Sequence, residues 1–225
     1  MHTYFESKRV DIYSYDVDLR ITDFPEPANP NWLYYFSITV RFTDPDEDEW
    51  SHGGLQWAGT FRENVNKGVN WGGGANWAGY GGIGVNNTPF DWQLHRWYRL
   101  RVLRGNKDSD GLQHWVFYIM DYDTTHEQKF GTVKAKSEWI KSADVFTETG
   151  YGVQCETPTA RAEWRNPCFR TPSGLFSPEI GIANYNGTCI EQHNTNQCLI
   201  TKDPTPHWIH ETNCVRTVDP NHHLW

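Results

Sequence analysis

The stretch from Leu33 to Phe42, LYYFSITVRF, is the clearest β-strand in the sequence. Aromatic and β-branched residues fill most of it, and these residue types favour a pleated strand. Three prolines lie in residues 24–31 before it, and an acidic run, residues 43–49, follows it. Both flanks are typical of loops, so this segment predicts a single strand bounded by turns.

Two further strands follow downstream as a hairpin. Residues 96–104 (RWYRLRVLR) alternate between two faces, and residues 113–121 (QHWVFYIMD) form the second strand. The segment between them, residues 105–111 (GNKDSDG), has the glycine and aspartate content of a turn that joins antiparallel strands.

Short strand patterns separated by turns occur along most of the chain, and no helix longer than two turns is indicated. One helical turn is expected at residues 137–142. Eight or more short strands predict an all-β fold, an antiparallel β-sandwich of the jelly-roll type. The remaining strand patterns lie at residues 11–20, 129–133, 145–155, 161–170 and 179–184.

The length of 225 residues suits one large β domain. We expect the sandwich to occupy residues 1–185, with a Cys-containing C-terminal extension, residues 186–225, packed on it. The five cysteines favour two disulfides that hold the extension, with one thiol left over, although five reduced cysteines are the alternative. They are Cys155, Cys168, Cys189, Cys198 and Cys214.

The net charge is −8, from 28 acidic and 20 basic residues. This balance argues against nucleic acid as a partner, because phosphate backbones need a basic stripe. A mean hydropathy of −0.73, with no apolar run near about 18 residues, predicts no membrane span. The opening residues MHTYFESKRV contain no apolar signal region. We nevertheless expect a secreted or extracellular protein.

Residues 51–99 are rich in tryptophan and glycine. Six of the twelve tryptophans lie in or beside this segment, together with eleven of the nineteen glycines. Flat rings beside residues without side chains suit a sugar ring, which stacks on aromatics and needs directed hydrogen bonds. We expect a carbohydrate-binding groove with stacking and hydrogen-bonding residues drawn from Trp57, Trp71, Trp77, Tyr80, Gln56, Asn70, Asn76 and His52.

The segment from residue 33 to residue 121 resembles the concanavalin A-like lectin and glucanase group of jelly rolls. The resemblance rests on the strand at residues 33–42, the Gly- and Trp-rich middle, and residues 96–102 followed by 115–118. It implies a sandwich that binds glycans on a concave sheet, and some members cleave them. The paired-acid E-x-D-x-x-E strand and the alginate-lyase motifs are absent, so no catalytic residue is carried over.

Polysaccharide cleavage is the first alternative to simple binding. Glycoside hydrolysis usually uses two carboxylates about 5–10 Å apart. Glu148, flanked by aromatic residues, is the first candidate, and Glu163 beside Trp164 is the second. Surface positions or arginine partners are the alternative for both. A lyase would instead use a histidine such as His52, or a tyrosine, as its base. A protein-interaction or structural surface protein is the second alternative.

The turn at residues 105–111 also has the opening spacing of a calcium loop. Asn106, Asp108 and Asp110 would supply ligands, but Phe117 stands where the loop needs its last acidic residue. A plain hairpin turn is therefore favoured, and no metal or cofactor is expected.

Overall fold

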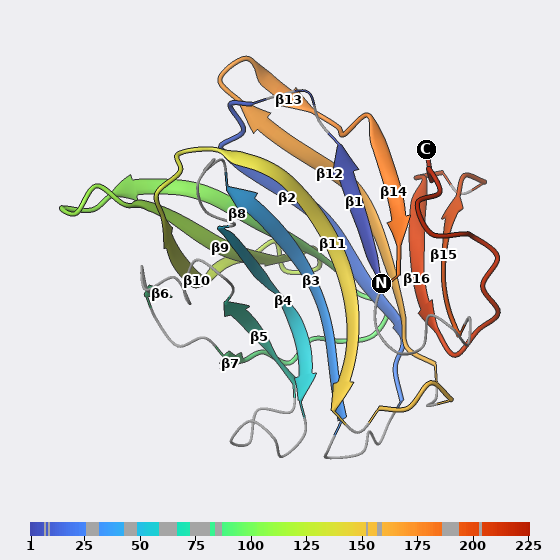
Figure 1. Ribbon diagram of the computed structural model, residues 1–225. Coiled ribbons are helices and arrows are strands. Elements are labelled where there is room, and N and C mark those ends of the chain that lie inside the picture. Colours follow the sequence, from blue (N-terminus) through green and yellow to red (C-terminus); the bar gives the residue numbers. More distant parts are fainter. Residues whose placement is uncertain are drawn as a thin grey trace.

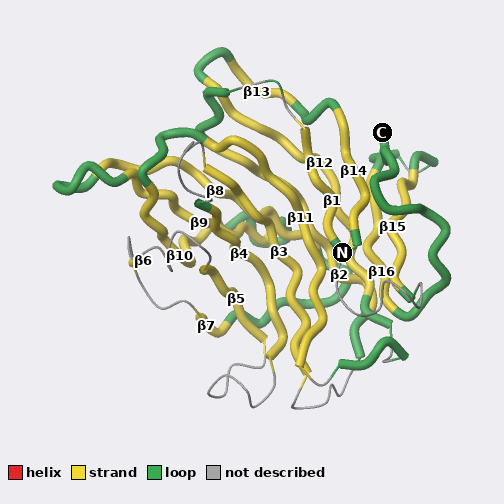
Figure 2. The backbone as a smooth tube through the Cα atoms, viewed as in Figure 1, coloured by secondary structure: helices red, strands yellow, loops and turns green. Residues whose placement is uncertain are grey.

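The computed structural model describes residues 1–6, 8, 10–25, 32–42, 49–58, 67–72, 82–83, 87–151, 153–156, 159–185, 194–202 and 204–225. Over these residues the chain forms two antiparallel β-sheets and no helix (Figures 1 and 2). The predicted all-β sandwich is confirmed. The described residues accordingly include no helix long and apolar enough to cross a membrane.

One sheet has seven strands within the described residues, and its middle strands bend strongly along their length (Figure 1). From one edge to the other its order is β14 (Ile180–Asn184), β1 (His2–Glu6), β11 (Ile140–Tyr151), β3 (Trp32–Phe42), β4 (Trp50–Ala58), β5 (Lys67–Gly72) and β7 (Asn87–Pro89).

The second sheet has nine described strands, eight in one row and β13 (Gly174–Phe176) paired to the side of β12. The row runs β15 (Thr195–Ile200), β16 (His207–Thr212), β12 (Arg161–Thr171), β2 (Ser14–Asp23), β8 (Trp97–Lys107), β9 (Gln113–Asp121), β10 (Glu127–Ala135) and β6 (Gly82–Ile83).

The core lies between the two sheets and follows from alternation along each strand. In β3 the residues Tyr34, Phe36 and Ile38 are fully buried in the core cluster. Successive strand residues point to opposite faces, so the residues between them face away from the other sheet. In β8 and β9 the inward positions are Tyr98, Leu100, Val102, Trp115, Phe117 and Ile119.

Two glycines let aromatic rings of the opposite sheet approach the backbone. A Cβ added to Gly53 on β4 would lie 2.5 Å from a ring carbon of Phe117 on β9. A Cβ added to Gly131 on β10 would overlap the ring of Trp71 on β5. In each of these two contacts, a glycine of one sheet lies against a large ring of the other sheet. The absence of a side chain at the glycine allows the two sheets to pack this closely.

The C-terminal segment contributes strands to the second sheet. The β15–β16 pair joins that sheet because β16 pairs with β12. The domain division at residue 185 stays a prediction. The prediction of two disulfides is wrong, since three of the five cysteines are free thiols: Cys168, Cys198 and Cys214.

The helical turn expected at residues 137–142 is also wrong. Ile140 begins β11 and pairs with Phe42 of β3, and its backbone N–H donates to the carbonyl oxygen of Ile12. Pairing with two neighbouring segments satisfies this backbone as a strand, so the weak local preference for a helix is overridden.

Candidate functional site

Three neighbouring strands of the seven-stranded sheet align Gln56, Tyr35 and Glu148 in one row. Tyr35 of β3 pairs with Gln56 of β4 on one side and with Glu148 of β11 on the other. Directly paired residues share a face, and the neighbours Tyr34 and Phe36 face the core, so the row lies on the outer face. Two strand spacings, about 10 Å, separate the backbones of Gln56 and Glu148. Their side chains can therefore reach one bound group above Tyr35.

The row combines a buried floor with an accessible carboxylate. Gln56 is 2% exposed and Tyr35 is 4% exposed, whereas Glu148 is exposed. The Tyr35 hydroxyl donates to the carbonyl oxygen of Asn70 at 3.0 Å, which fixes the phenol ring. Across the described part of the chain, no side chain or backbone group bonds to the Glu148 carboxylate. Glu148 is thus available to a ligand while its neighbours are held.

An aromatic strip crosses the same face, formed by Trp50, His52, Tyr35, Phe146 and His2. Neighbouring ring centroids lie 5.4 Å apart for Trp50 and His52, 5.3 Å for His52 and Tyr35, and 5.4 Å for Tyr35 and Phe146. His2 stacks on Phe146 at 5.2 Å. These contacts give the face an apolar floor on both sides of Tyr35.

Asp144 on β11 is a second carboxylate of this face, but its charge is compensated. It is fully buried, it accepts from Arg41 at 2.5 Å, and it lies 2.8 Å from Nδ1 of His2. The guanidinium of Arg41 also sits 5.6 Å from the ring centroid of Tyr4. Burial, and then the charge of Asp144, raises the pKa of Tyr4. Asp144 therefore organises the end of the strip and is closed to a reacting water.

Four of the predicted site residues share this outer face. They are His52, Gln56, Asn70 and Glu148, contributed by β4, β5 and β11. Asn70 is 7% exposed and pairs in register with Gly54, next to the Gln56 position. The sheet thus gathers polar residues that are up to 96 positions apart in the sequence, as the numbers of His52 and Glu148 show.

The two described tryptophans of the expected groove do not belong to that face. Trp57 is 9% exposed and Trp71 is 3% exposed, and both belong to the core cluster. Trp57 pairs with Tyr34, an inward residue of β3, and the Trp71 ring packs on Gly131 of the opposite sheet. Their predicted exposure as stacking platforms is wrong, because both rings are sealed inside the sandwich.

Trp77, Tyr80 and Asn76, the other predicted groove residues, lie outside the described residues. Glu163 lies on the outer face of the other sheet. It is 5% exposed, accepts from Nε of Arg20 at 2.8 Å, and lies 3.6 Å from Arg161. Glu163 and Glu148 therefore stand on opposite sides of the sandwich and cannot act as a pair.

The loop compared with a calcium site is a hairpin turn. Asp108 accepts the backbone N–H groups of Asp110 and Leu112 at 2.9 and 3.0 Å, and Nζ of Lys134 lies 2.6 Å from its other oxygen. The hydrogen bond from Lys134 lowers the pKa of Asp108 to about 2. In the described residues no three His, Cys, Asp or Glu side chains are placed to hold a metal ion, and Asn106 joins no such group.

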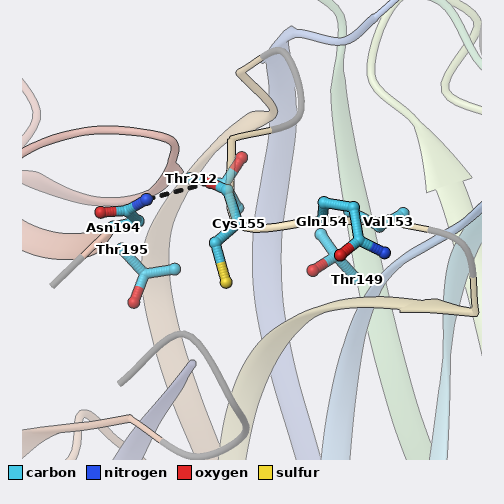
Figure 3. Close-up of a pocket in the computed structure, with 7 residues that line it drawn as sticks. All are labelled: Thr149, Val153, Gln154, Cys155, Asn194, Thr195 and Thr212. Atoms are coloured by element: carbon cyan, nitrogen blue, oxygen red, sulfur yellow. Dashed lines mark hydrogen bonds between the residues drawn. The ribbon is translucent and has the colours of Figure 1, made fainter. Parts of the chain in front are cut away.

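A small pocket opens beside the end of β11 (Figure 3). The side-chain amide of Asn194 donates to the carbonyl oxygen of Cys155 at 3.3 Å across it. None of its lining residues is charged, so it offers no acid or base. They are Thr149, Val153, Gln154, Cys155, Asn194, Thr195 and Thr212.

Sequence reasoning missed several residues of the outer face. Tyr35 and Arg41 lie at alternate positions of the strand that was expected, and Asp144 and Phe146 precede Glu148 in steps of two. The period-two rule alone would have grouped each set on one face. Which of the two faces turns outward depends on the pairing of distant strands, which local sequence does not contain.

No family model matches this chain, and no curated protein matches it. Three solved structures are similar over 95% of this chain and 96% of theirs, each at 8% identity. One is SCP-B, a member of the eqolisin family of peptidases, with the tripeptide Ala-Ile-His (TM-score 0.47). The others are scytalido-glutamic peptidase with a peptide-based transition-state analogue (0.47) and with a transition-state analogue inhibitor (0.46). The two-sheet sandwich of this chain itself agrees with the jelly-roll resemblance at the level of fold.

The predicted carbohydrate-binding function is wrong. Trp57 and Trp71, its stacking rings in the described chain, are inside the protein. Glu148 and Glu163, the two first candidates of the hydrolase alternative, cannot form its carboxylate pair, because they lie on different sheets.

Proposed function

We propose that this protein binds a peptide across the outer face of the seven-stranded sheet and hydrolyses it. Glu148 acts as the general base, and Gln56 donates a hydrogen bond to the tetrahedral intermediate. The observation that carries the proposal is the row of Gln56, Tyr35 and Glu148, which sets a carboxamide and a carboxylate on either side of one phenol ring.

One accessible carboxylate beside a neutral amide suits amide hydrolysis better than glycoside hydrolysis. Most glycosidases use two carboxyl groups, and the carboxylate that lies four residues from Glu148 on the same face of β11, Asp144, is held by Arg41 and His2. Amide hydrolysis needs a base that takes a proton from water and a donor that stabilises the oxyanion. Glu148 and Gln56 match these two roles in chemistry and in position.

The reaction proceeds in two steps. In the first, the Glu148 carboxylate takes a proton from water while the water oxygen bonds to the scissile carbonyl carbon. The carbonyl electron pair moves to the oxygen, which accepts a hydrogen bond from the Gln56 amide. In the second, the intermediate re-forms the carbonyl and the C–N bond breaks. Glu148 returns its proton to the leaving nitrogen.

The aromatic strip supplies the contacts that hold the substrate. Its partly exposed rings lie on both sides of Tyr35, so residues flanking the scissile bond rest on His2 on one side and on His52 and Trp50 on the other. Phe146, which is 5% exposed, lies beneath His2 and supports it. Each ring offers apolar area at a small entropic cost, and a peptide with apolar or aromatic side chains gains most from this surface.

The test is cleavage of a peptide library and of a denatured protein between about pH 3 and about pH 8. Products are identified by mass spectrometry. We expect Glu148→Gln to lower kcat by about 10²–10⁴-fold, because it removes the base. Gln56→Glu, which replaces the donor with an acceptor of the same size, should lower kcat by about 10²–10³-fold.

The matched control is Glu179→Gln, which removes the same charge from an exposed side chain that pairs with Lys8. It should keep full activity, and the melting temperature of Glu148→Gln should match the wild type because its carboxylate is exposed. Peptide cleavage that survives Glu148→Gln unchanged, or no cleavage of any peptide over the whole pH range, rules the proposal out.

A further inference from the structure

His210 of β16 lies at a junction between the two sheets. It is fully buried, and its two ring nitrogens contact the other sheet. Nε2 lies 2.8 Å from Oγ1 of Thr3 on β1, and Nδ1 lies 3.0 Å from Oγ1 of Thr147 on β11. Since β1 and β11 belong to the seven-stranded sheet and β16 to the other, one imidazole ties both sheets together.

The surrounding hydrogen bonds decide where the protons of this ring are. The side-chain amide nitrogen of Gln197 donates to the carbonyl oxygen of Asn184 at 2.8 Å, so its amide oxygen faces Thr3. Thr3 must then donate to that oxygen, at 2.6 Å, because an amide oxygen only accepts. With its proton used, the Thr3 oxygen accepts from Nε2–H of His210.

Burial favours the neutral ring, so the other nitrogen, Nδ1, carries no proton. Nδ1 accepts from the hydroxyl of Thr147, and His210 is neutral with its proton on Nε2. Each group in this series of hydrogen bonds donates to the next: Thr147 to His210, His210 to Thr3, Thr3 to Gln197, and Gln197 to the backbone carbonyl of Asn184. Every member is satisfied in this arrangement. A second proton, on Nδ1, would force Thr147 to turn its hydroxyl from donor to acceptor and would place a charge in a fully buried site.

We propose that neutral His210 is a proton-sensitive tie between the sheets, and that it positions β11, the strand that carries Glu148. Thr147 precedes Glu148, and the pairing of β11 with β3 keeps Glu148 opposite Tyr35. His210 is thus a positioning residue for the site. This last link rests on the proposed peptidase function, whereas the tie between the sheets does not.

Among the residues that the structure describes, no negative charge faces the ring to favour its protonation. The amino group of Met1, just before β1, and the imidazole of His2 on β1 act on it electrostatically, and from β11 it contacts Thr147. From β15 and β12 it meets Gln197 and Trp164, which do not titrate.

Burial first, and then these two basic groups, lowers the pKa of His210 well below its ordinary value. The unfolded chain therefore binds a proton that the folded chain does not. The stability that His210 contributes is complete above about pH 6.5 and is lost as the pH falls toward its folded pKa.

Nitrogen-15 NMR of the histidine rings in the wild-type protein tests the tie without any variant. We expect Nε2 to be protonated and Nδ1 to be bare between about pH 8 and about pH 5. A ring protonated on Nδ1, or on both nitrogens at about pH 6, overturns the proposal.

Acid unfolding, followed by tryptophan fluorescence, supplies the second measurement. Below about pH 6.5 His210 should raise the unfolding constant by about tenfold per pH unit. His210→Gln should remove this component of the slope, and the exposed control His126→Gln should keep it. Equal slopes in His210→Gln and the wild type also overturn the proposal.

The positioning role has its own readout. If peptides are cleaved, His210→Gln should flatten the acid limb of kcat/KM and leave KM within about twofold. An unchanged pH profile in an active His210→Gln variant refutes the link to Glu148. If no peptide is cleaved, the proposed function fails, and the NMR and unfolding results still decide whether the tie exists.

Discussion

Trp71→Ala should lower the free energy of unfolding by about 3–5 kcal/mol. Trp71 is 3% exposed, so nearly the whole ring leaves water on folding. A tryptophan buries about 150–250 Å², which at about 25 cal/mol per Å² corresponds to about 4–6 kcal/mol. Alanine keeps part of that area, which brings the expected loss to the range given. Peptide cleavage by the folded variant should remain, because the ring faces away from Glu148.

Urea denaturation followed by circular dichroism measures this loss, and an unchanged m-value would show that the same surface unfolds. The matched control is Trp50→Ala, which removes a partly exposed ring from the aromatic strip and should cost less stability but weaken peptide binding.

Gly131→Ala probes the same contact from the other sheet. It should cost about 1–3 kcal/mol by overpacking, because its Cβ would overlap the Trp71 ring. The double variant should cost less than the sum of the two, since the new methyl group enters the cavity. A Trp71→Ala variant within about 0.5 kcal/mol of the wild type would refute the placement of this ring in the core.

Three further predictions concern charges and thiols. Asp144→Asn should cost about 1–3 kcal/mol in urea unfolding, because it leaves the partly exposed Arg41 without its buried partner. Equal stability would contradict that role. Lys134→Met should move the pKa of Asp108 up from about 2 in an NMR titration. The stability that this carboxylate contributes is present above its ordinary pKa and is lost as the pH falls toward 2, and added Ca²⁺ should leave the melting temperature unchanged. Burial raises the pKa of Cys214 to about 11, so the free thiols should react slowly with a disulfide reagent at about pH 8, and at least three should react once the chain is denatured. Rapid reaction of the native protein would contradict this.

Alternation along the chain was enough to predict strands and a sandwich, because the pattern of Leu33 to Phe42 recurs in the later strands. Alternation does not determine the order of the strands in each sheet. In the seven-stranded sheet β11 lies between β1 and β3, and this depends on contacts across more than 100 residues of sequence. Nothing in the sequence near His2 or near Phe146 indicates that these two residues pair.

The expected groove failed for a reason that the sequence itself contained. Gln56 and Trp57 are consecutive in one strand, as are Asn70 and Trp71, and consecutive residues point to opposite faces. A groove that used both members of each pair was therefore impossible on regular strands. In the structure, the amides of Gln56 and Asn70 lie on the outer face, and the two tryptophans lie in the core. The same period of two places Glu148 on one face of its strand, but only the pairing of the strands in the fold shows that Gln56 lies near it.

The exchange of glycines and rings between the sheets, Gly53 with Phe117 and Gly131 with Trp71, has an evolutionary consequence. Neither member of a pair can change size alone, so relatives of this chain should carry compensated substitutions, a larger residue at 131 only where 71 has shrunk. The two pairs also fix the position of one sheet relative to the other at two separate points, and each sheet contributes one of the two rings. A slip of one layer by a single residue would drive both rings into backbone, and homologues that diverge everywhere else should conserve this alignment.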